Sequence, residues 1–444
     1  MTPPAKGAIA AGHPATAEAG ARVLQDGGNA VDACIAAAFA AFAAEGPLTG
    51  PAGGGFVLAY VDEEPTMLDC FFAVPSQPLG EIEHVTVDFG STTQSYHIGL
   101  GSVAVPGLIA GLLEAHRRWG RLPWRDLVEP SIGFARRGLD VNEAQAFLHE
   151  ILTPVLLRDE GGRRIYGSRT RIVTEDLCAT LEALRDDPTA AVHALVPELS
   201  ADLEAYAVIE REPLHGRFHG RQVFATPPPS RGGVVVVAVL EAFDEAATLH
   251  ERAAALKDAY ARSPVAAKGT THISVVDADG NAIGLSSTLG AGSGVHRGGT
   301  QLNNMLGEFD VVGYGPKVPG ERLASMMTPT LVIEDGRPRL VLGSAGSVRL
   351  SGAIAQVVTR VVGGASVADA IAAPRIHVVG DTLHLEGGWP PETADAFPPD
   401  AWELVAWQSL NLYFGGVSAV ELQVDGTLAA AGDPRRGGHG IVVA

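Results

Sequence analysis

Two pairs of short apolar runs, each joined by an Asp-Gly turn, constrain the fold of this chain more than any other feature. The runs of the first pair are 270–276 and 282–288, and those of the second are 330–333 and 340–342. Glycine adopts the positive φ that a tight turn between strands needs, so Gly280 and Gly336 mark the tips of two antiparallel hairpins. The chain is therefore expected to contain an antiparallel sheet.

Segments of helical character surround these hairpins. The sequence predicts a strand at 56–61 and helices at 15–24, 30–44, 107–119, 127–137, 174–188, 246–261 and 352–362. Gly27 and Gly28 suit the C-terminal end of the first helix, and Asn29 can cap the second. The Val-rich run 234–240 fits either a buried strand or the start of a helix. We predict the α+β class, with helices layered on an antiparallel sheet.

Composition narrows the classes of partner. The 444 residues carry a net charge of −19, which repels phosphate backbones and anionic lipid, so neither nucleic acid nor a membrane is an expected partner. The apolar stretch 33–44 is too short to span a bilayer, and the N-terminus has no basic start before a long apolar core. Three cysteines, Cys34, Cys70 and Cys178, form no even disulfide set. We expect a cytoplasmic protein.

Two other motifs carry little chemistry. His215 and His219 are four residues apart, but no carboxylate spacing completes a metal site around them. The glycine loop 53–55 lacks the Lys-Ser/Thr pair that follows a phosphate-binding loop. We therefore expect neither a metal nor a cofactor.

Gly269-Thr270 at the start of the first hairpin is the candidate reactive site. On its own, a threonine after glycine is an ordinary opening of a β-strand. Its interest comes from blocks that occur in order along nearly the whole chain. They are 27–33 (GGNAVDA), 53–56 (GGGF), 102–107 (SVAVPG), 120–124 (GRLPW), 227–230 (PPPS), 270–281 (TTHISVVDADGN), 373–377 (APRIH) and 433–436 (DPRR).

With these blocks, the sequence resembles the γ-glutamyltransferase (γ-glutamyltranspeptidase) family of N-terminal-nucleophile hydrolases. The resemblance implies a four-layer αββα sandwich and a precursor that cleaves itself before Thr270. The products would be a large segment, 1–269, and a small segment, 270–444, that interleave as one αβ unit; whether two units pair is open. A freed N-terminal threonine has its own α-amine as a general base, which makes Thr270 the implied nucleophile.

The resemblance also implies roles for three supporting residues. Thr288 matches a second threonine that supports the nucleophile by hydrogen bonding. Gly346 and Ser347 match a Gly-Gly pair whose backbone N–H groups form an oxyanion hole, where each donor contributes on the order of 3 kcal/mol. Serine replaces the second glycine here, and a backbone donor survives that change if φ stays negative.

The substrate-binding positions depart from the family. An Arg that grips the substrate α-carboxylate is replaced at Phe71 or its neighbour Phe72, and phenylalanine cannot pair with a carboxylate. The remaining departures are Gly290 for Asn, Met305 for Gln, Glu308 for Asp, and Ser325-Met326 for a pair of serines. Such a site favours a less charged or partly aromatic acyl group, although a weakened γ-glutamyl enzyme remains the alternative.

Two short segments favour hydrolysis over transfer. The stretch from the PPPS block to Thr270 and the lid between Phe309 and Arg322 are both shorter than in the family. A short lid admits water, so the leading hypothesis is an amidohydrolase acting on a small amide or peptide-like substrate. The first alternative is a natural-product enzyme that uses Thr270 on a carbon–carbon bond or a small amide such as oxamate. The second is an uncleaved binding protein without catalytic activity.

Overall fold

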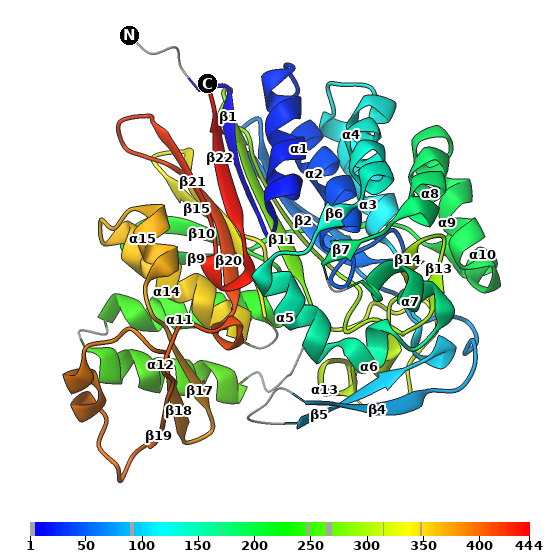
Figure 1. Cartoon of the computed structure of the whole chain (residues 1–444). Coiled ribbons are helices and arrows are strands. Elements are labelled where there is room, and N and C mark those ends of the chain that lie inside the picture. The colour runs from blue at the N-terminus through cyan, green and yellow to red at the C-terminus, as the bar shows by residue number, and fades with distance from the viewer. Residues whose placement is uncertain are drawn as a thin grey trace.

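The computed structural model describes residues 5–88, 93–168, 170–245, 248–262, 269–313, 315–346 and 349–444. Two large sheets lie face to face, and helices cover the outer face of each (Figure 1). The predicted four-layer αββα sandwich of the α+β class is therefore confirmed. Of the helices in the described ranges, none has the length and apolarity to cross a membrane.

The first sheet brings together strands from both ends of the chain. Its seven strands are, in spatial order, β22 (His439–Val443), β1 (Gly7–Ala11), β11 (Thr271–Asp277), β12 (Ala282–Thr288), β2 (Gly54–Val61), β3 (Glu64–Cys70) and β8 (Ile209–Arg211). All neighbours pair antiparallel, with Ala10 opposite Ser274 and Ser286 opposite Phe56. The N-terminal segment thus contributes strands on both sides of the β11–β12 hairpin.

The second sheet is built mainly from the C-terminal segment. Its six strands are β21 (Leu428–Gly432), β20 (Gly416–Leu422), β16 (Arg337–Ala345), β15 (Thr330–Glu334), β10 (Arg221–Ala225) and β9 (Leu214–Phe218). Alternate side chains of the two sheets fill the space between them, where Phe56, Val276, Leu331 and Val341 are at most 1% exposed. Burial of this kind stabilises the sandwich by about 25 cal/mol for each Å² of apolar surface removed from water.

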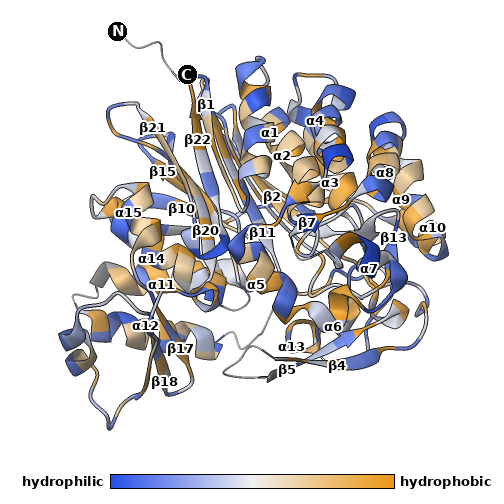
Figure 2. Ribbon diagram, in the orientation of Figure 1, coloured by the Kyte–Doolittle hydropathy of each residue, from blue (hydrophilic) through white to orange (hydrophobic). Residues whose placement is uncertain are grey.

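Two separate helical layers bury the outer faces of the sheets. The first sheet is covered by α1 (Pro14–Gln25), α2 (Ala30–Ala44), α3 (Leu108–Trp119) and α4 (Trp124–Arg137). The second is covered by α11 (Gly232–Glu245), α12 (Leu249–Arg262), α14 (Leu350–Val362) and α15 (Val367–Ala372). Figure 2 shows hydrophobic residues along the strands between these layers and hydrophilic residues toward the outer ends of α1 and α8.

Helix α2 directs the chain toward the start of the central strand β11, where Thr270 lies. Asn29 accepts a hydrogen bond from the backbone N–H of Asp32, while Asp32 accepts one from that of Asn29, so a complete capping box starts the helix. Every residue of α2 is buried, because α1, α3 and α4 surround it and β11 and β12 lie beneath it. Its C-cap is Glu45, which is thereby placed beside the first residues of β11.

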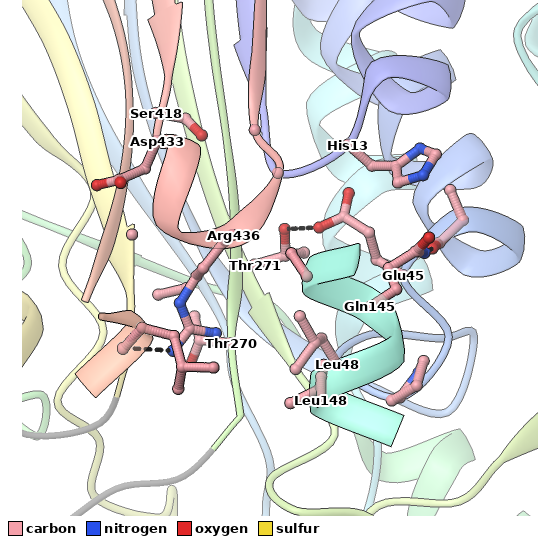
Figure 3. A pocket seen from close by; sticks show the side chains of 18 of the residues that line it. His13, Glu45, Leu48, Gln145, Leu148, Thr270, Thr271, Ser418, Asp433 and Arg436 are labelled. Carbon is pink, nitrogen blue, oxygen red and sulfur yellow. Dashed lines mark hydrogen bonds between the residues drawn. The ribbon is translucent and has the colours of Figure 1, made fainter. Parts of the chain in front are cut away.

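Smaller elements surround the sandwich. The helices are α5 (Glu143–Ile151), α6 (Thr153–Leu156), α7 (Glu160–Tyr166), α8 (Glu175–Asp186), α9 (Pro188–Leu195), α10 (Ser200–Ala205) and α13 (Phe309–Val312). The short strands are β4 (Glu83–Asp88), β5 (Thr93–Ile98), β6 (Leu139–Asp140), β7 (Arg171–Ile172), β13 (His296–Arg297), β14 (Thr300–Gln301), β17 (Ile376–Val379), β18 (Thr382–Leu385) and β19 (Glu403–Ala406). Helix α5 lies close to β11 and forms one wall of the candidate site (Figure 3).

Candidate functional site

Thr270 lies immediately before β11, at the end of a central strand of the first sheet. The predicted strand began at Thr270, whereas the observed strand begins at Thr271. Thr270 is only 2% exposed. Gly269 before it has a φ of +56°, and a β-carbon added there would collide with the carbonyl oxygen of Gly290. Glycine is therefore required at the predicted cleavage position for both conformational and steric reasons.

Two hydroxyl groups converge on the carbonyl oxygen between Gly269 and Thr270. Thr270 Oγ1 donates a hydrogen bond to this oxygen at 2.6 Å, and Thr288 Oγ1 donates a second one. Thr288 Oγ1 in turn accepts a hydrogen bond of 2.8 Å from the backbone N–H of Gly290. Donors on a carbonyl oxygen withdraw electron density from its carbon, so this peptide bond is polarised toward attack.

The loop after Thr288 is held by side chains that follow it in sequence. Asn304 Oδ1 accepts hydrogen bonds from the N–H groups of Ala291 (2.7 Å) and Gly292 (3.1 Å). Glu308 Oε1 accepts from Ala291 N–H (3.1 Å) and from the Asn304 amide (3.0 Å). A β-carbon on Gly290 would collide with Asn304 Oδ1. Glu308, a predicted substrate-binding residue, thus supports the loop that carries Gly290.

The other predicted substrate-binding residues are buried among neighbouring side chains. Phe71 and Phe72 are at most 1% exposed in the core between the sheets, and the Phe71 ring stacks on Phe56 with centroids 5.2 Å apart. Met305 joins the same core, and the Met305 sulfur would lie 3.2 Å from a β-carbon on Gly290. Their role in binding substrate stays a prediction.

Ser325 and Met326 lie beneath the start of α11. The Ser325 carbonyl accepts a hydrogen bond of 2.8 Å from the backbone N–H of Arg231, and Ser325 Oγ accepts one of 3.0 Å from Met327. The Met326 side chain is fully buried in the core outside the second sheet. Ser230 of the PPPS block also donates to the Ser325 carbonyl, at 3.3 Å, and so connects this block to the chain before β15. A role in substrate binding stays a prediction here too.

Gly346 follows β16 with a φ of +121°, a conformation that side-chain-bearing residues rarely adopt. A β-carbon there would approach the backbone of Gly415 and lie 3.3 Å from Nη2 of Arg436. Ser347, the second predicted oxyanion-hole residue, lies outside the described residues. The role of this pair in catalysis stays a prediction.

His272 of the TTHISVVDADGN block connects the two sheets. Its Nδ1 lies 2.8 Å from Ser286 Oγ and its Nε2 lies 2.9 Å from Ser274 Oγ, which donates onward to the carbonyl of Ser418 on β20. Full burial lowers the pKa of His272 to about 3, so the ring is neutral. The imidazole therefore has a structural role in positioning β11 against the second sheet.

A small pocket opens beside Thr270. It is lined by Thr270 and Thr271, the end of α2, helix α5, and the turn Pro434–Arg436, and its free volume is about 50 Å³ (Figure 3). A single water needs roughly 10–15 Å³, so the pocket has room for a few waters or a small polar group. Leu48, Leu148 and Leu412 make most of its wall apolar, and the acidic residues Glu45 and Asp433 and the basic residue Arg436 also line it.

Glu45 is one of the acidic residues that line this pocket. Its carboxyl group accepts hydrogen bonds from Thr16 Oγ1 at 2.7 Å and from Thr271 Oγ1, next to the candidate nucleophile. Burial is the largest influence on this group and raises its pKa above the ordinary value. The His13 ring beside it is also desolvated, which lowers its pKa to about 4 and keeps it neutral.

Arg436 is the basic side chain of this pocket and extends from the turn Pro434–Arg436 toward Thr270 (Figure 3). Part of the side chain remains accessible, but desolvation of the guanidinium lowers its pKa to about 10. Arg436 stays a cation at neutral pH. The sequence signal for it was present in the DPRR block, but nothing in that block distinguished Arg436 from Arg435.

Sequence reasoning also missed Glu45, Gln145 and Asn304. Asn304 lies within the segment that carries Met305 and Glu308, so its position was a usable signal. Glu45 and Gln145 come from helices separated by about a hundred residues, and the side-chain amide of Gln145 donates to the carbonyl of Ala44 at 2.6 Å. Only the folded chain brings them to Thr270.

Within the described ranges, no group of three or more His, Cys, Asp or Glu side chains is placed to hold a metal ion.

Sequence comparison relates this chain to known protein families and to characterised proteins. A family model described as Gamma-glutamyltranspeptidase matches residues 16–194 and 246–443. The chain is 27% identical to the acylase ACY 1 proenzyme of Pseudomonas sp. (strain V22), covering 99% of this chain and 94% of that protein. It is 28% identical to the glutathione hydrolase proenzyme of Escherichia coli (strain K12), covering 97% and 90%.

A solved structure shares the architecture. The cephalosporin acylase from Bacillus halodurans superposes with a TM-score of 0.83 over 99% of this chain and 96% of that one, at 20% sequence identity. At that identity the likeness establishes the fold alone. The segments that match the family model include Thr270, Thr288, Glu308 and Arg436.

Proposed function

The chain belongs to the gamma-glutamyltranspeptidase family, and on that premise we propose that it is a self-processing amidohydrolase with Thr270 as its nucleophile. Membership makes it a hydrolase or acylase of the N-terminal-nucleophile type. The observation that carries the finer proposal is the pair of hydroxyls, from Thr270 and Thr288, on the carbonyl oxygen of Gly269. That geometry suits attack on this one peptide bond.

Self-cleavage would proceed through an ester. Thr270 Oγ1 attacks the carbonyl carbon of Gly269, while Thr288 stabilises the negative charge that develops on the oxygen. The carbon–nitrogen bond then breaks, and the nitrogen of Thr270 takes the proton lost by the hydroxyl. Water hydrolyses the resulting ester and leaves Gly269 with a free carboxylate and Thr270 with a free α-amine.

Turnover would repeat this chemistry on an external amide. The α-amine of Thr270 accepts the hydroxyl proton as Oγ1 attacks the substrate carbonyl, and the leaving amine departs with that proton. The acyl group remains on Thr270 as an ester until water releases it. Gly346 and Ser347 are the proposed donors to the oxyanion. We infer hydrolysis rather than transfer because the lid segment of this chain is short.

The two fragments would remain one αβ unit after cleavage. Strand β1 of the N-terminal fragment pairs with β11 on one side and β22 on the other, and both of those belong to the C-terminal fragment. Separating the fragments would expose strand edges and both faces of the first sheet, so we propose a stable heterodimer.

Denaturing mass spectrometry of the purified protein is the direct test. Two fragments that end at Gly269 and begin at Thr270 are expected, followed by hydrolysis of small amides in a substrate screen. A single intact chain of 444 residues that turns over no amide would contradict the proposal. That outcome would favour the non-catalytic binding protein.

A further inference from the structure

We propose that water reaches Thr270 by a route of its own, through a cavity between α5 and α7 that opens at the surface and meets the pocket beside Thr270 at His149. The route rests on the proposed function, because it carries the water that hydrolyses the acyl ester on Thr270. His149 is then a positioning residue for this water. Its place in the wall between the two cavities favours hydrolysis over transfer to an amine.

The route consists of two cavities. The outer cavity has a free volume of about 130 Å³ and is lined by residues of α5, α6 and α7, with Glu150 and Thr153 as its polar part. The inner cavity is the pocket of about 50 Å³ beside Thr270. Among the described residues that line them, only His149 belongs to both. The imidazole therefore separates the outer cavity from the inner pocket.

The outer cavity reaches the surface of the molecule. Ala146 and Glu150 line it, and both are exposed. One water needs roughly 10–15 Å³, so the cavity has room for several. Tyr166 is buried at its inner end, where the hydroxyl would lie 2.6 Å from a β-carbon on Gly46. Gly46 follows Glu45, so the outer cavity ends against the chain segment that also forms the inner pocket.

His149 offers water an unused hydrogen-bonding atom at this junction. Its Nε2 is buried and has no partner within the described residues. Burial lowers the pKa of His149 to about 4, so at neutral pH the ring is neutral and has one donor and one acceptor nitrogen. The Tyr166 ring packs edge-on against the imidazole, with centroids 5.2 Å apart. A buried polar atom without a partner is costly, so a water on Nε2 is expected.

The inner pocket borders the position of the reacting ester. Thr270 lines it together with Ala345, the residue before Gly346 of the proposed oxyanion hole. An acyl group on Thr270 Oγ1, with its carbonyl oxygen toward Gly346, would lie beside this pocket. Water attacks the ester carbon from there, the bond to Oγ1 breaks, and the proton of the water passes through the α-amine of Thr270 to Oγ1. The products are the free acid and the regenerated threonine.

A separate route gives water an advantage over other nucleophiles. When the ester forms, the leaving amine still occupies the substrate side of Thr270, whereas water can approach through the inner pocket. A peptide amine such as glycylglycine is too large to follow water past His149. Hydrolysis is therefore expected to compete well even at high concentrations of an amine acceptor.

Competition between water and glycylglycine tests the route. With the fastest amide of the substrate screen as acyl donor, chromatography measures the ratio of free acid to acyl-glycylglycine. Ala146→Trp fills the outer cavity and leaves the inner pocket intact, because Ala146 lines only the outer one. It is expected to lower the hydrolysis-to-transfer ratio at least about fivefold. His149→Phe keeps a ring in the wall without its nitrogens and should also lower the ratio.

Phe147→Trp is the matched control on α5. Phe147 is 44% exposed and lines neither of the two cavities, so added bulk there should leave the ratio unchanged. Circular dichroism and thermal unfolding report whether each variant folds. An unchanged ratio in a folded Ala146→Trp, or an equal fall in Phe147→Trp, would overturn the inference.

A crystal structure of the natural protein tests the site without turnover. Water is expected in both cavities, with one molecule hydrogen-bonded to His149 Nε2. A dry outer cavity, or a protein group on Nε2, would overturn the inference even if neither variant folds or glycylglycine is not accepted. An uncleaved protein that turns over no amide, yet holds water on His149, keeps the water site and loses the hydrolase. A protein that hydrolyses amides with an unchanged ratio in Ala146→Trp keeps the hydrolase and loses the route.

Discussion

Arg435 and Arg436 are adjacent in sequence and end in opposite environments. The Arg435 side chain is fully buried and donates to Glu386 (2.7 Å), Asp433 (3.1 Å) and two backbone carbonyls, those of Ile371 and Ala373. The guanidinium of Arg436, one residue later, makes a single hydrogen bond of 3.4 Å to the described residues and borders a cavity. One arginine belongs to a network of ion pairs, and the other lies beside the pocket with few hydrogen bonds to the part of the chain that the structure describes.

The network around Arg435 shows what a structural buried charge looks like in this fold. Arg375 is fully buried and donates to Asp433 and to the carbonyls of Phe414 and Ile371. Glu386 accepts from Arg435 through both oxygens and from the backbone N–H groups of Arg375 and Asn411. Every carboxylate oxygen of this cluster has a partner. Among the described residues, the Nε of Arg375 has no partner, as is also true of the Nε of Arg436. The two sites therefore differ in their carboxylates: Arg435 and Arg375 are each paired with one, whereas Arg436 donates to a backbone carbonyl.

Replacing the nucleophile should have the largest effect and should separate function from stability. Thr270→Ala removes the attacking oxygen, so the protein is expected to remain a single chain and to lose at least about 10³-fold in turnover. Its unfolding temperature should change little. Intact-mass measurement and an amide hydrolysis assay check this. Thr270→Ser keeps a hydroxyl and should still cleave. Normal cleavage by Thr270→Ala would show that the reactive residue lies elsewhere.

Removing a member of the Arg435 cluster should lower the stability of the fold, whereas replacing Thr270 should lower only the activity. Glu386→Ala leaves a buried arginine without its main partner, and the expected loss is about 3–5 kcal/mol in the free energy of unfolding. Denaturant unfolding measures it. Glu403→Ala is the matched control. It removes an exposed glutamate from β19, which pairs with β18, the strand that ends just before Glu386, and it should change the free energy of unfolding by no more than about 0.5 kcal/mol. Similar effects for both glutamates would remove the distinction between paired and spare charges.

Thr288 tests the polarisation of the scissile carbonyl. Thr288→Val keeps the shape of the side chain but removes the donor to the Gly269 carbonyl, so self-cleavage should slow by about 10²–10³-fold. The fraction of cleaved chain, followed by electrophoresis over time after purification, gives the rate. Thr288→Ser retains the donor and should cleave at a rate close to that of the natural protein. An unchanged rate for Thr288→Val would make this hydrogen bond incidental.

Much of the fold could be predicted from local signals. The helix expected at 30–44 is observed as Ala30–Ala44, because the capping box of Asn29 and Asp32 acts within one turn. Both Asp-Gly hairpins form as expected, with β12 spanning Ala282–Thr288. The Val-rich run 234–240 fits either a strand or a helix by its sequence. It lies in α11, where packing against β9 and β10 outweighs the β-branched valines.

Only some residues of the candidate site could be predicted from the sequence. Gly269, Thr270 and Thr288 could be found because the hairpin that carries them is contiguous in sequence. The pocket could not, because Glu45 and Arg436 come from opposite ends of the chain and meet only when β1 inserts between β11 and β22. No local pattern reports which of two neighbouring arginines keeps its donors free.

The smallest expected effect concerns Glu45, an acidic residue in the pocket with Arg436. Desolvation raises its pKa in the folded state, so the folded protein favours the protonated carboxyl more than the unfolded chain does. Well below the ordinary pKa of 4.5, the carboxyl is protonated in both states, so the raised pKa does not change the free energy of unfolding. As the pH rises from there through the raised pKa, the unfolded chain ionises first and the folded state loses relative stability.

Glutamine at position 45 stays neutral at every pH, so it removes that loss. The unfolding temperature of Glu45→Gln minus that of the natural protein is therefore expected to increase as the pH rises from 4.5 through the raised pKa, and then to level off. Thermal denaturation across this range measures the difference, with the exposed Glu212→Gln as control. A difference that stays constant or falls with pH would mean that Glu45 is ionised in the fold. The attraction between Glu45 and the guanidinium of Arg436 would then outweigh the desolvation of the carboxyl, and Arg436 would have a charged partner within the protein.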